Sequence, residues 1–467
     1  MVKRFITYLF IGFAIELVMI PLKSEASRHE DLKLMKEDIV ELSDRLDRVE
    51  TKSILDRVII GGEFRSRLNY FKYEDTTATL DLFTSGAEDD ATTEDIWSNR
   101  LRLNLRTDVT YNLVFHGRLT YFKLWGESNF FMPEMDMTIP SIPDSEGNLH
   151  VERAYIDYRI PDSHIVISFG RLPTNEGPPN GLRDYTTRKA TYPRLFIDGE
   201  SDGIIASFSL DEWTNSKGST FRLHYFGFIT NTLQDKGVDF DNSRLLVASF
   251  ETQVPEIKNS FMWISFAKLL DLPTGEAYSD LYGTLDAPPI TSAPEDGGHG
   301  ELYCLHFQFN DINESGLDCF ASFALISVYP RSRGTVFGGI YEVGIFGDNL
   351  NGDLGESRDG NSIYLGLRYE LPIDVFNNPK IGLEYNHSSK YWFGMFSSGS
   401  GDLVNKLNVG GDAYEIYFIQ PIIEKRMFCR FGGVYMDYDY DKSNTFVSVP
   451  DSDMTLINSY LLMDVRF

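Results

Sequence analysis

The side chains in this 467-residue sequence best suited to act on solutes are arginines that recur at every second position in several short stretches. A spacing of two places side chains on one face of a β-strand, so these arginines would form a basic wall. Glu384 and Glu415, in later stretches, would face it from a more acidic wall. Such a pair of walls sets a transverse field across an aqueous pore, which passes ions and small polar molecules and slows apolar ones. The predicted pore-lining residues are Arg65, Arg67, Arg100, Arg102, Arg106, Arg118, Arg153, Asp157, Arg159, Glu384 and Glu415. The alternative is that these charges pair across strands and only fill the interior.

A second set of charges lies in an irregular segment near residues 171–202. Four prolines and several glycines fix a non-repetitive path there, and the charges are mostly basic until Asp198. An ordinary exposed loop is one interpretation. Basic character in a protein whose other loops are acidic favours a loop that folds into the pore as a constriction. Its predicted residues are Arg171, Arg183, Asp184, Arg188, Lys189 and Arg194.

Catalytic and metal-binding patterns are weak. The histidines lack the HExxH spacing, and the three cysteines lack the Cys-x-x-Cys spacing. His387 precedes two serines, but neighbouring side chains at a strand end point apart. By strand parity Cys304 faces inward and Cys319 outward, which argues against a disulfide between them. We therefore predict a protein that is not an enzyme and that uses no cofactor or metal.

The elements that must position these charges are β-strands. Apolar and strongly polar residues alternate with period two, as in transmembrane barrels; a soluble sandwich would have shorter strands and a polar face rich in Lys, Glu, Ser and Thr. Single-chain bacterial barrels have even strand numbers. Counting the strand-like segment 335–346 would give seventeen strands and would put the long 388–411 loop on the wrong side of the membrane. We therefore assign this segment to an outer loop. The sequence then predicts an all-β antiparallel barrel of about sixteen strands over 58–467: 58–73, 97–109, 112–125, 150–160, 163–171, 202–210, 219–229, 243–253, 259–269, 300–310, 317–328, 361–370, 380–387, 412–421, 426–438 and 455–467.

The first 57 residues predict export and a helix. A charged start, an apolar run and a small-x-small site ending at Ala26 indicate a signal peptide at 1–26. Glu16 and Pro21 weaken the alternative of a membrane anchor. Residues 27–57 then carry an a/d seam spaced 3, 4, 3, 4, 3, which predicts a short coiled coil; an amphipathic helix lying on the same chain is the alternative. The seam consists of Leu32, Met35, Ile39, Leu42, Leu46 and Val49.

Two resemblances narrow the class. The final amphipathic strand ends in Phe467 and resembles the last strand of bacterial outer-membrane barrels, which implies recognition by the barrel-assembly machinery. The stretches 170–203, 381–392 and 414–417 resemble an uncharacterised family of porin-like outer-membrane proteins with an N-terminal coiled coil, a domain of unknown function. This resemblance covers most of residues 30–467. It implies a barrel and supplies no substrate.

The charge of the chain argues against a nucleic-acid-binding protein and indicates where its acidic loops lie. With 43 Lys and Arg against 69 Asp and Glu, the net charge of −26 argues against a nucleic-acid partner. The segments 74–96 and 271–299 hold eight and six acids, and neither holds Lys or Arg. At the outer mouth of a barrel, such loops would bind divalent cations shared with lipopolysaccharide or enrich cations.

We therefore predict an outer-membrane channel for passive diffusion of ions and small polar solutes. Its expected partners are outer-membrane lipid and lipopolysaccharide, two further copies of the chain in a homotrimer, and the barrel-assembly machinery. The trimer is inferred by analogy and from the coiled-coil seam. The alternative function is structural: residues 30–52 would bind a periplasmic envelope component while the barrel serves as an anchor.

Overall fold

The computed structural model divides the chain into two units, residues 1–58 and 59–467. It describes residues 36, 40–42, 58–74, 91–125, 149–227, 244–270, 299–329, 333–336, 339–342, 357–392, 394, 402–440 and 451–467, with backbone only for 91–95 and 333–342. Residues 36 and 40–42 are helical. The predicted signal peptide and most of the predicted coiled coil lie outside the described residues.

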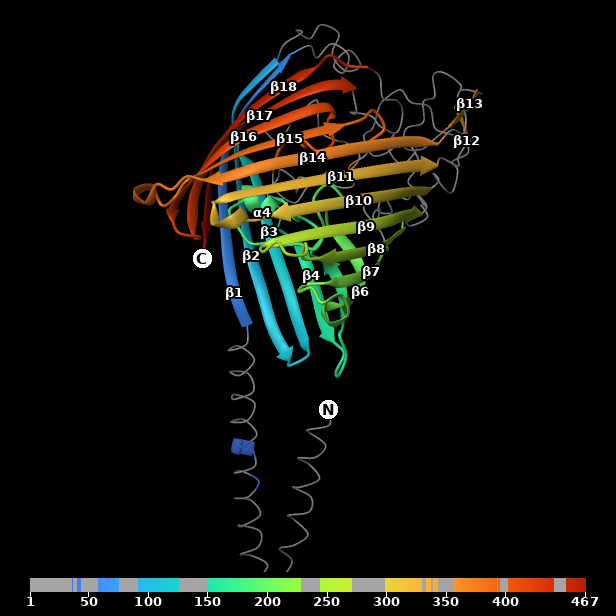
Figure 1. Cartoon of the computed structure of the whole chain (residues 1–467), viewed down its shortest axis with the longest axis vertical. Coiled ribbons are helices and arrows are strands. Elements are labelled where there is room, and N and C mark those ends of the chain that lie inside the picture. The colour runs from blue at the N-terminus through green and yellow to red at the C-terminus, as the bar shows by residue number, and fades with distance from the viewer. Residues whose placement is uncertain are drawn as a thin grey trace, which may run out of the picture. The chain divides into compact units, whose positions relative to one another are not determined.

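The second unit is a closed antiparallel barrel of sixteen strands, which confirms the predicted strand number and fold class (Figure 1). Neighbours in sequence are neighbours in the wall, except that β11 pairs directly with β14. The wall strands are β1 (Val58–Glu74), β2 (Ala91–Thr110), β3 (Leu113–Trp125), β4 (Leu149–Arg159), β5 (Ile165–Leu172), β6 (Ser201–Ser209), β7 (Thr220–Gly227), β8 (Arg244–Thr252), β9 (Ser260–Leu270), β10 (His299–Phe309), β11 (Leu317–Tyr329), β14 (Arg358–Glu370), β15 (Lys380–Ser388), β16 (Gly410–Ile423), β17 (Met427–Tyr440) and β18 (Thr455–Arg466).

The barrel closes where β18 meets β1. Glu63 pairs with Arg466 in the register, and beyond it Gly62 and Phe467 exchange two backbone hydrogen bonds of 2.6 and 3.0 Å. Both ends of this pair lie at the end of the barrel where the turns are short, here called the short-turn end. The opposite end, where the connections are long, is the long-loop end.

The remaining elements are small. β12 (Arg333–Val336) and β13 (Gly339–Glu342) form a separate two-stranded sheet, so this segment lies outside the barrel wall as predicted. Short helices follow several strands: α4 (Asn180–Arg183), α5 (Asp211–Thr214), η1 (Ile312–Glu314) and η2 (Asp374–Phe376). No helix in the described part of the chain is long and apolar enough to cross a bilayer.

Alternation along the strands separates two environments. Leu101 and Leu103 on β2 face outward and are 37% exposed, whereas Arg100 and Arg102 face the lumen and are 4% and 1% exposed. A water-filled lumen would leave polar side chains wet. Burial this complete shows instead that protein fills the lumen at the level of these arginines.

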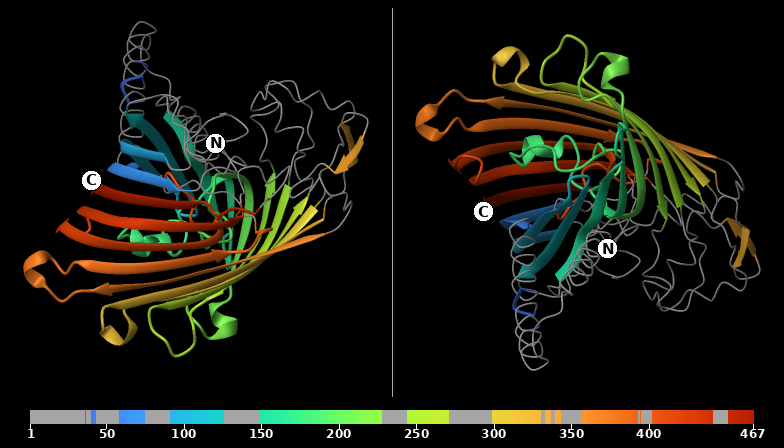
Figure 2. Two further views of the ribbon diagram at one scale, coloured as in Figure 1. Left: turned by 90° about the horizontal axis from the view of Figure 1, so that it is seen from above. Right: turned by 90° about the horizontal axis from the view of Figure 1, so that it is seen from below.

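Two connections from the long-loop end provide that filling. The first inward segment, residues 173–200, joins β5 to β6 and carries α4, which lies within the ring of strands (Figure 2). The second inward segment, residues 402–409, belongs to the connection between β15 and β16. Buried apolar side chains of the first pack against β6–β11 and β14, whereas Leu403, Val404 and Val409 of the second join a cluster with β1–β3 and β16–β18.

Candidate functional site: the charged layer of the lumen

The lumen also contains a layer of buried ion pairs, here called the charged layer. Its first centre is Glu176 of the first inward segment, which is 3% exposed. The Glu176 carboxylate lies 2.6 Å from a guanidinium nitrogen of Arg102, 3.1 Å from one of Arg100 and 3.4 Å from one of Arg118. Burial by itself raises the pKa of Glu176, but the surrounding positive charges outweigh it and hold the pKa well below its usual range. Glu176 therefore stays ionised and neutralises the arginines of β2 and β3.

An irregularity in β4 supplies a second acid. The register of β3 and β4 shifts between Arg118 and Leu119, and this bulge turns both Glu152 and Arg153 into the lumen. Glu152 pairs with Arg102 at 2.7 Å and with Arg118 at 3.0 Å. Strict alternation places Glu152 on the outer face, so sequence periodicity could not have found it.

A third centre lies near the short-turn end. Asp184 contacts Arg430 at 2.8 Å and Arg65 at 3.3 Å, and Arg65 also binds Asp464 at 2.9 Å. Burial raises the pKa of Asp184, yet the neighbouring guanidinium groups bring it well below its usual range. Arg466 donates a 2.7 Å hydrogen bond to the Asp184 carbonyl oxygen. These contacts fix the tip of the first inward segment to β1, β17 and β18.

The second inward segment enters the layer through Asp402. Its carboxylate binds Arg67 of β1 and both Arg183 and Arg194 of the first segment, the last at 3.6 Å. Burial raises the pKa of Asp402, but the arginines hold it well below its usual range. The connection 388–411 leaves the wall at the end of the long loops, as expected, but its residues 402–409 turn back into the lumen, where three buried guanidinium groups bind this acid.

Lys406 provides the second charged contact of this segment. Its ammonium group binds Glu384 on β15 and Glu415 on β16, and its side chain is 4% exposed. Arg183 lies 3.3 Å from the same Glu415. Glu384 and Glu415 thus face the lumen, but a lysine and an arginine neutralise them.

The first inward segment also has an apolar face. The Tyr192 ring lies 5.6 Å from Trp263 and 5.7 Å from Phe196 between ring centroids, and Tyr192 and Phe196 are completely buried. Strands β6–β11 present mostly apolar side chains to this part of the lumen. The arginines of β1–β4 therefore pair with acids of the inward segments and with Glu152 of β4 and Asp464 of β18, whereas the first inward segment lies with its apolar face against β6–β11.

The predicted strand residues fall into two groups. Arg65, Arg67, Arg100, Arg102, Arg118 and Arg153 lie in the layer and are at most 7% exposed. Arg106 and Arg159 are exposed at the short-turn end, where Arg106 pairs with Asp108 at 3.2 Å. Asp157 accepts a 2.6 Å hydrogen bond from Ser168 and is partly exposed.

The predicted loop residues divide in the same way. Arg183, Asp184 and Arg194 lie in the layer, and Lys189 reaches Glu63 at 2.7 Å. Arg188 binds Glu251 of β8 and remains partly exposed. The assignment of Arg171 to the constriction is wrong. It is the penultimate residue of β5, and because the next residue, Leu172, points inward, Arg171 points outward and pairs with Asp202 at 3.0 Å.

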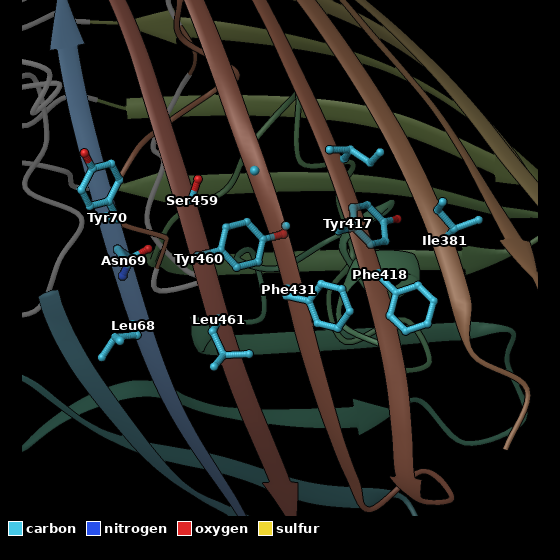
Figure 3. Close-up of a pocket in the computed structure, with 13 residues that line it drawn as sticks. Leu68, Asn69, Tyr70, Ile381, Tyr417, Phe418, Phe431, Ser459, Tyr460 and Leu461 are labelled. Carbon is cyan, nitrogen blue, oxygen red and sulfur yellow. The ribbon is translucent and has the colours of Figure 1, made fainter. Parts of the chain in front are cut away.

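A groove of about 470 Å³ opens on the opposite, outer surface of the wall, over β1 and β15–β18 (Figure 3). Leu68, Phe418, Phe431 and Leu461 are among the residues that line it, and Gly433 leaves its floor without a side chain. The groove is almost entirely apolar, as expected of a surface in contact with hydrocarbon. Among the described residues, no cluster of His, Cys, Asp and Glu is arranged to hold a metal ion.

Fold and lumen together define a closed sixteen-stranded antiparallel barrel with two inward connections. The chain belongs to the family described as "Protein of unknown function (DUF3373)", whose model matches residues 90–465. This confirms the resemblance to an uncharacterised family. No curated relative matches the sequence.

Solved structures similar to this chain include several outer-membrane proteins. OprB of Pseudomonas putida, in a high-pH structure, is 12% identical with a TM-score of 0.49, covering 89% of this chain and 96% of that one. An anion-selective porin from Comamonas acidovorans is 10% identical with a TM-score of 0.46, covering 88% and 99%. The trimer form of OmpT from Vibrio cholerae is 9% identical with a TM-score of 0.42, covering 88% and 99%.

Proposed function

We propose that this protein is a porin-like channel of the bacterial outer membrane for ions and small polar solutes. The observation that carries the proposal is the charged layer: polar groups brought into the lumen of a barrel whose outer face is apolar. A sixteen-stranded barrel is wide enough for an aqueous channel when no segment of the protein fills its lumen.

The residues of the charged layer are the ones that a solute would meet on the way through. We propose that Arg65, Arg67, Arg100, Arg102, Arg118, Arg153, Glu384 and Glu415 line the path, with Arg183, Asp184, Lys189 and Arg194 at the constriction. Because each basic group has acidic neighbours, selectivity depends on local pairs more than on a field between two walls. Replacing Arg100 and Arg102 by Glu should therefore shift the reversal potential toward cations.

Export and membrane insertion complete the proposal. Residues 1–26 would act as a signal peptide, and the last strand with Phe467 would be read by the barrel-assembly machinery. The short-turn end would then face the periplasm, and the acidic segments 74–96 and 271–299 would face lipopolysaccharide and its divalent cations. Three copies would assemble through the coiled coil predicted at residues 27–57.

A structural role is the second candidate, and the filled lumen favours it. In that case residues 30–52 would bind an envelope component and the barrel would only anchor them. Conductance in planar bilayers separates the two candidates. A channel gives discrete ohmic conductance steps. If neither the wild type nor the lumen variants give any conductance, the result would support the role of the barrel as an anchor.

A further inference from the structure

The two inward segments meet inside the charged layer. Arg183 and Arg194 of the first segment both contact Asp402 of the second. The side chains of Arg183 and Arg194 are 4% and 3% exposed, and that of Asp402 is 7% exposed. The lining of a conducting pore is hydrated, so the lumen bounded by these residues is closed in this conformation.

The first segment is fastened to the wall along its length. Arg368 of β14 donates a 2.6 Å hydrogen bond to the Leu182 carbonyl oxygen, and Arg430 of β17 donates one of 2.9 Å to that of Arg183. Its apolar face, with Tyr192 and Phe196, is buried against β7 and β9. Moving this segment would expose a hydrophobic cluster and several backbone acceptors, which is costly.

The second segment is shorter and is bound differently. Lys406 joins it to Glu384 and Glu415 on its own flanking strands, and the Trp392 indole donates a 2.9 Å hydrogen bond to the Leu407 carbonyl oxygen. These contacts stay within the β15–β16 connection. Of the two charged residues of the segment, Asp402 is the one that pairs across the lumen with the first segment and with β1. The apolar side chains of the segment also contribute, since Leu403, Val404 and Val409 pack in the cluster with β1–β3 and β16–β18 and Leu407 packs in the cluster of the first segment.

Each arginine bound to Asp402 has another acceptor that does not belong to the second segment. Arg183 contacts Glu415 at 3.3 Å, Arg194 contacts Asp198 at 2.8 Å, and Arg67 donates a 2.8 Å hydrogen bond to the Asn69 side chain. Withdrawal of Asp402 therefore leaves no arginine of this cluster without a partner. A buried ion pair usually resists separation because one charge is stranded, and here that penalty is reduced.

We propose that residues 402–409 are a latch that keeps the lumen closed and that the channel opens when Asp402 leaves Arg183 and Arg194. The inference rests on the channel function proposed above. The first inward segment stays in place as the constriction, and the water that enters hydrates the released arginines and the carboxylate. Opening is then a two-state movement of one short segment.

The latch is tested by Asp402→Asn, which keeps the shape of the side chain and removes its charge. In planar bilayers the fraction of time in the open state should rise several-fold over the wild type. The matched control is Asp412→Asn. Asp412 lies on β16 and accepts hydrogen bonds from Tyr385 at 2.7 Å and from His387 at 3.0 Å, contacts that do not involve the charged layer, so this variant should behave as the wild type.

A reversible cross-link between positions 194 and 402 tests the same movement independently of Asp402→Asn. The double variant Arg194→Cys, Asp402→Cys is made with the native cysteines replaced by Ser. Its channel should spend the same fraction of time in the open state as that of Asp402→Asn. A thiol-reactive bifunctional reagent that is cleaved by reductant should close the channel when it joins the two positions, and dithiothreitol should reopen it. Retained resistance to SDS at room temperature shows that the barrel is folded.

The outcomes separate the two proposals. If Asp402→Asn opens no more than the wild type, or if the link leaves the steps unchanged, the latch is wrong while the channel stands. If the wild type is nearly silent and the released variants conduct, both proposals hold. Silence of every folded variant overturns both.

Discussion

Arg183 and Asp402 form a buried ion pair inside the barrel although 219 positions separate them in the chain. Each belongs to a connection that leaves the wall at the long-loop end and turns back into the lumen. Without the other connection, each would lose a main partner in a region shielded from water. The ion pair therefore joins the two inward segments to each other inside the charged layer.

Glu176 should be among the most sensitive positions of the barrel. Glu176→Gln leaves Arg100, Arg102 and Arg118 with too little negative charge, and breaking a buried pair from one side costs about 3–5 kcal/mol. The free energy of unfolding in urea, followed by tryptophan fluorescence in detergent, measures this cost. Glu212→Gln is the control, since Glu212 and His164 form an exposed pair, and it should leave the unfolding midpoint unchanged. Equal midpoints for both variants would contradict the role of Glu176.

The charged layer should resist acid until well below neutral pH. The pKa values of Glu176, Asp184 and Asp402 are held below their usual range, so these acids bind protons more weakly in the folded than in the unfolded chain. Their contribution to stability is complete above the unfolded values of about 4, and it is lost as pH falls below them. Urea midpoints should stay level from pH 7 to about 5 and decline from about 4 downward.

The same series on Glu176→Gln supplies the control for the acid effect. This variant has lost one of the three acids, so its decline below about pH 4 should be shallower than that of the wild type. A steep decline that begins near neutral pH would indicate that other groups control the acid stability.

Two glycines provide a matched pair on the wall. A Cβ at Gly382 would overlap the buried ring of Tyr417 on the neighbouring strand, whereas the nearest atom to a Cβ at Gly433 is 3.9 Å away. Gly382→Ala should destabilise the barrel by about 1–3 kcal/mol through overpacking, and Gly433→Ala should be close to neutral. Thermal unfolding, scored by the band shift on SDS gels, compares the two. A tolerated alanine at both positions would show that Tyr417 moves freely.

The apolar face of the first inward segment should stabilise the whole barrel. Phe196 is completely buried, and Phe196→Ala should cost about 3–5 kcal/mol. Trp213, on α5, is 85% exposed and serves as the control, since Trp213→Ala removes a large side chain without opening a cavity. Limited proteolysis should cut residues 173–200 faster in Phe196→Ala alone. Protection equal to the wild type would mean that the ion pairs hold the segment without this contact.

Deletion of residues 30–52 tests the predicted coiled coil. If the seam holds three copies together, native mass spectrometry of the truncated protein in detergent should give a monomer where the full chain gives a trimer. The reason is that the apolar a and d side chains of the seam would be buried only against those of the other copies, so the deletion removes that contact. A trimer that survives the deletion would place the subunit contacts on the barrel.

The sequence by itself determined the wall. Alternation such as Arg100 and Arg102 inward against Leu101 and Leu103 outward, together with an even strand count, predicted sixteen strands, because a period of two is a local property of the chain. It also predicted that the proline-rich segment carrying Arg183, Asp184 and Arg194 differs from an ordinary loop.

Only the tertiary structure decided what those charges do. Glu152 faces the lumen through a bulge, Arg171 turns outward at the end of β5, and Asp402 enters the lumen from a long connection whose inward turn the sequence did not predict. None of these follows from local periodicity, since the energy of a buried charge depends on partners that the chain brings from hundreds of residues away. The sequence determined which strand faces are charged, and the fold decided that the charges pair and fill the lumen.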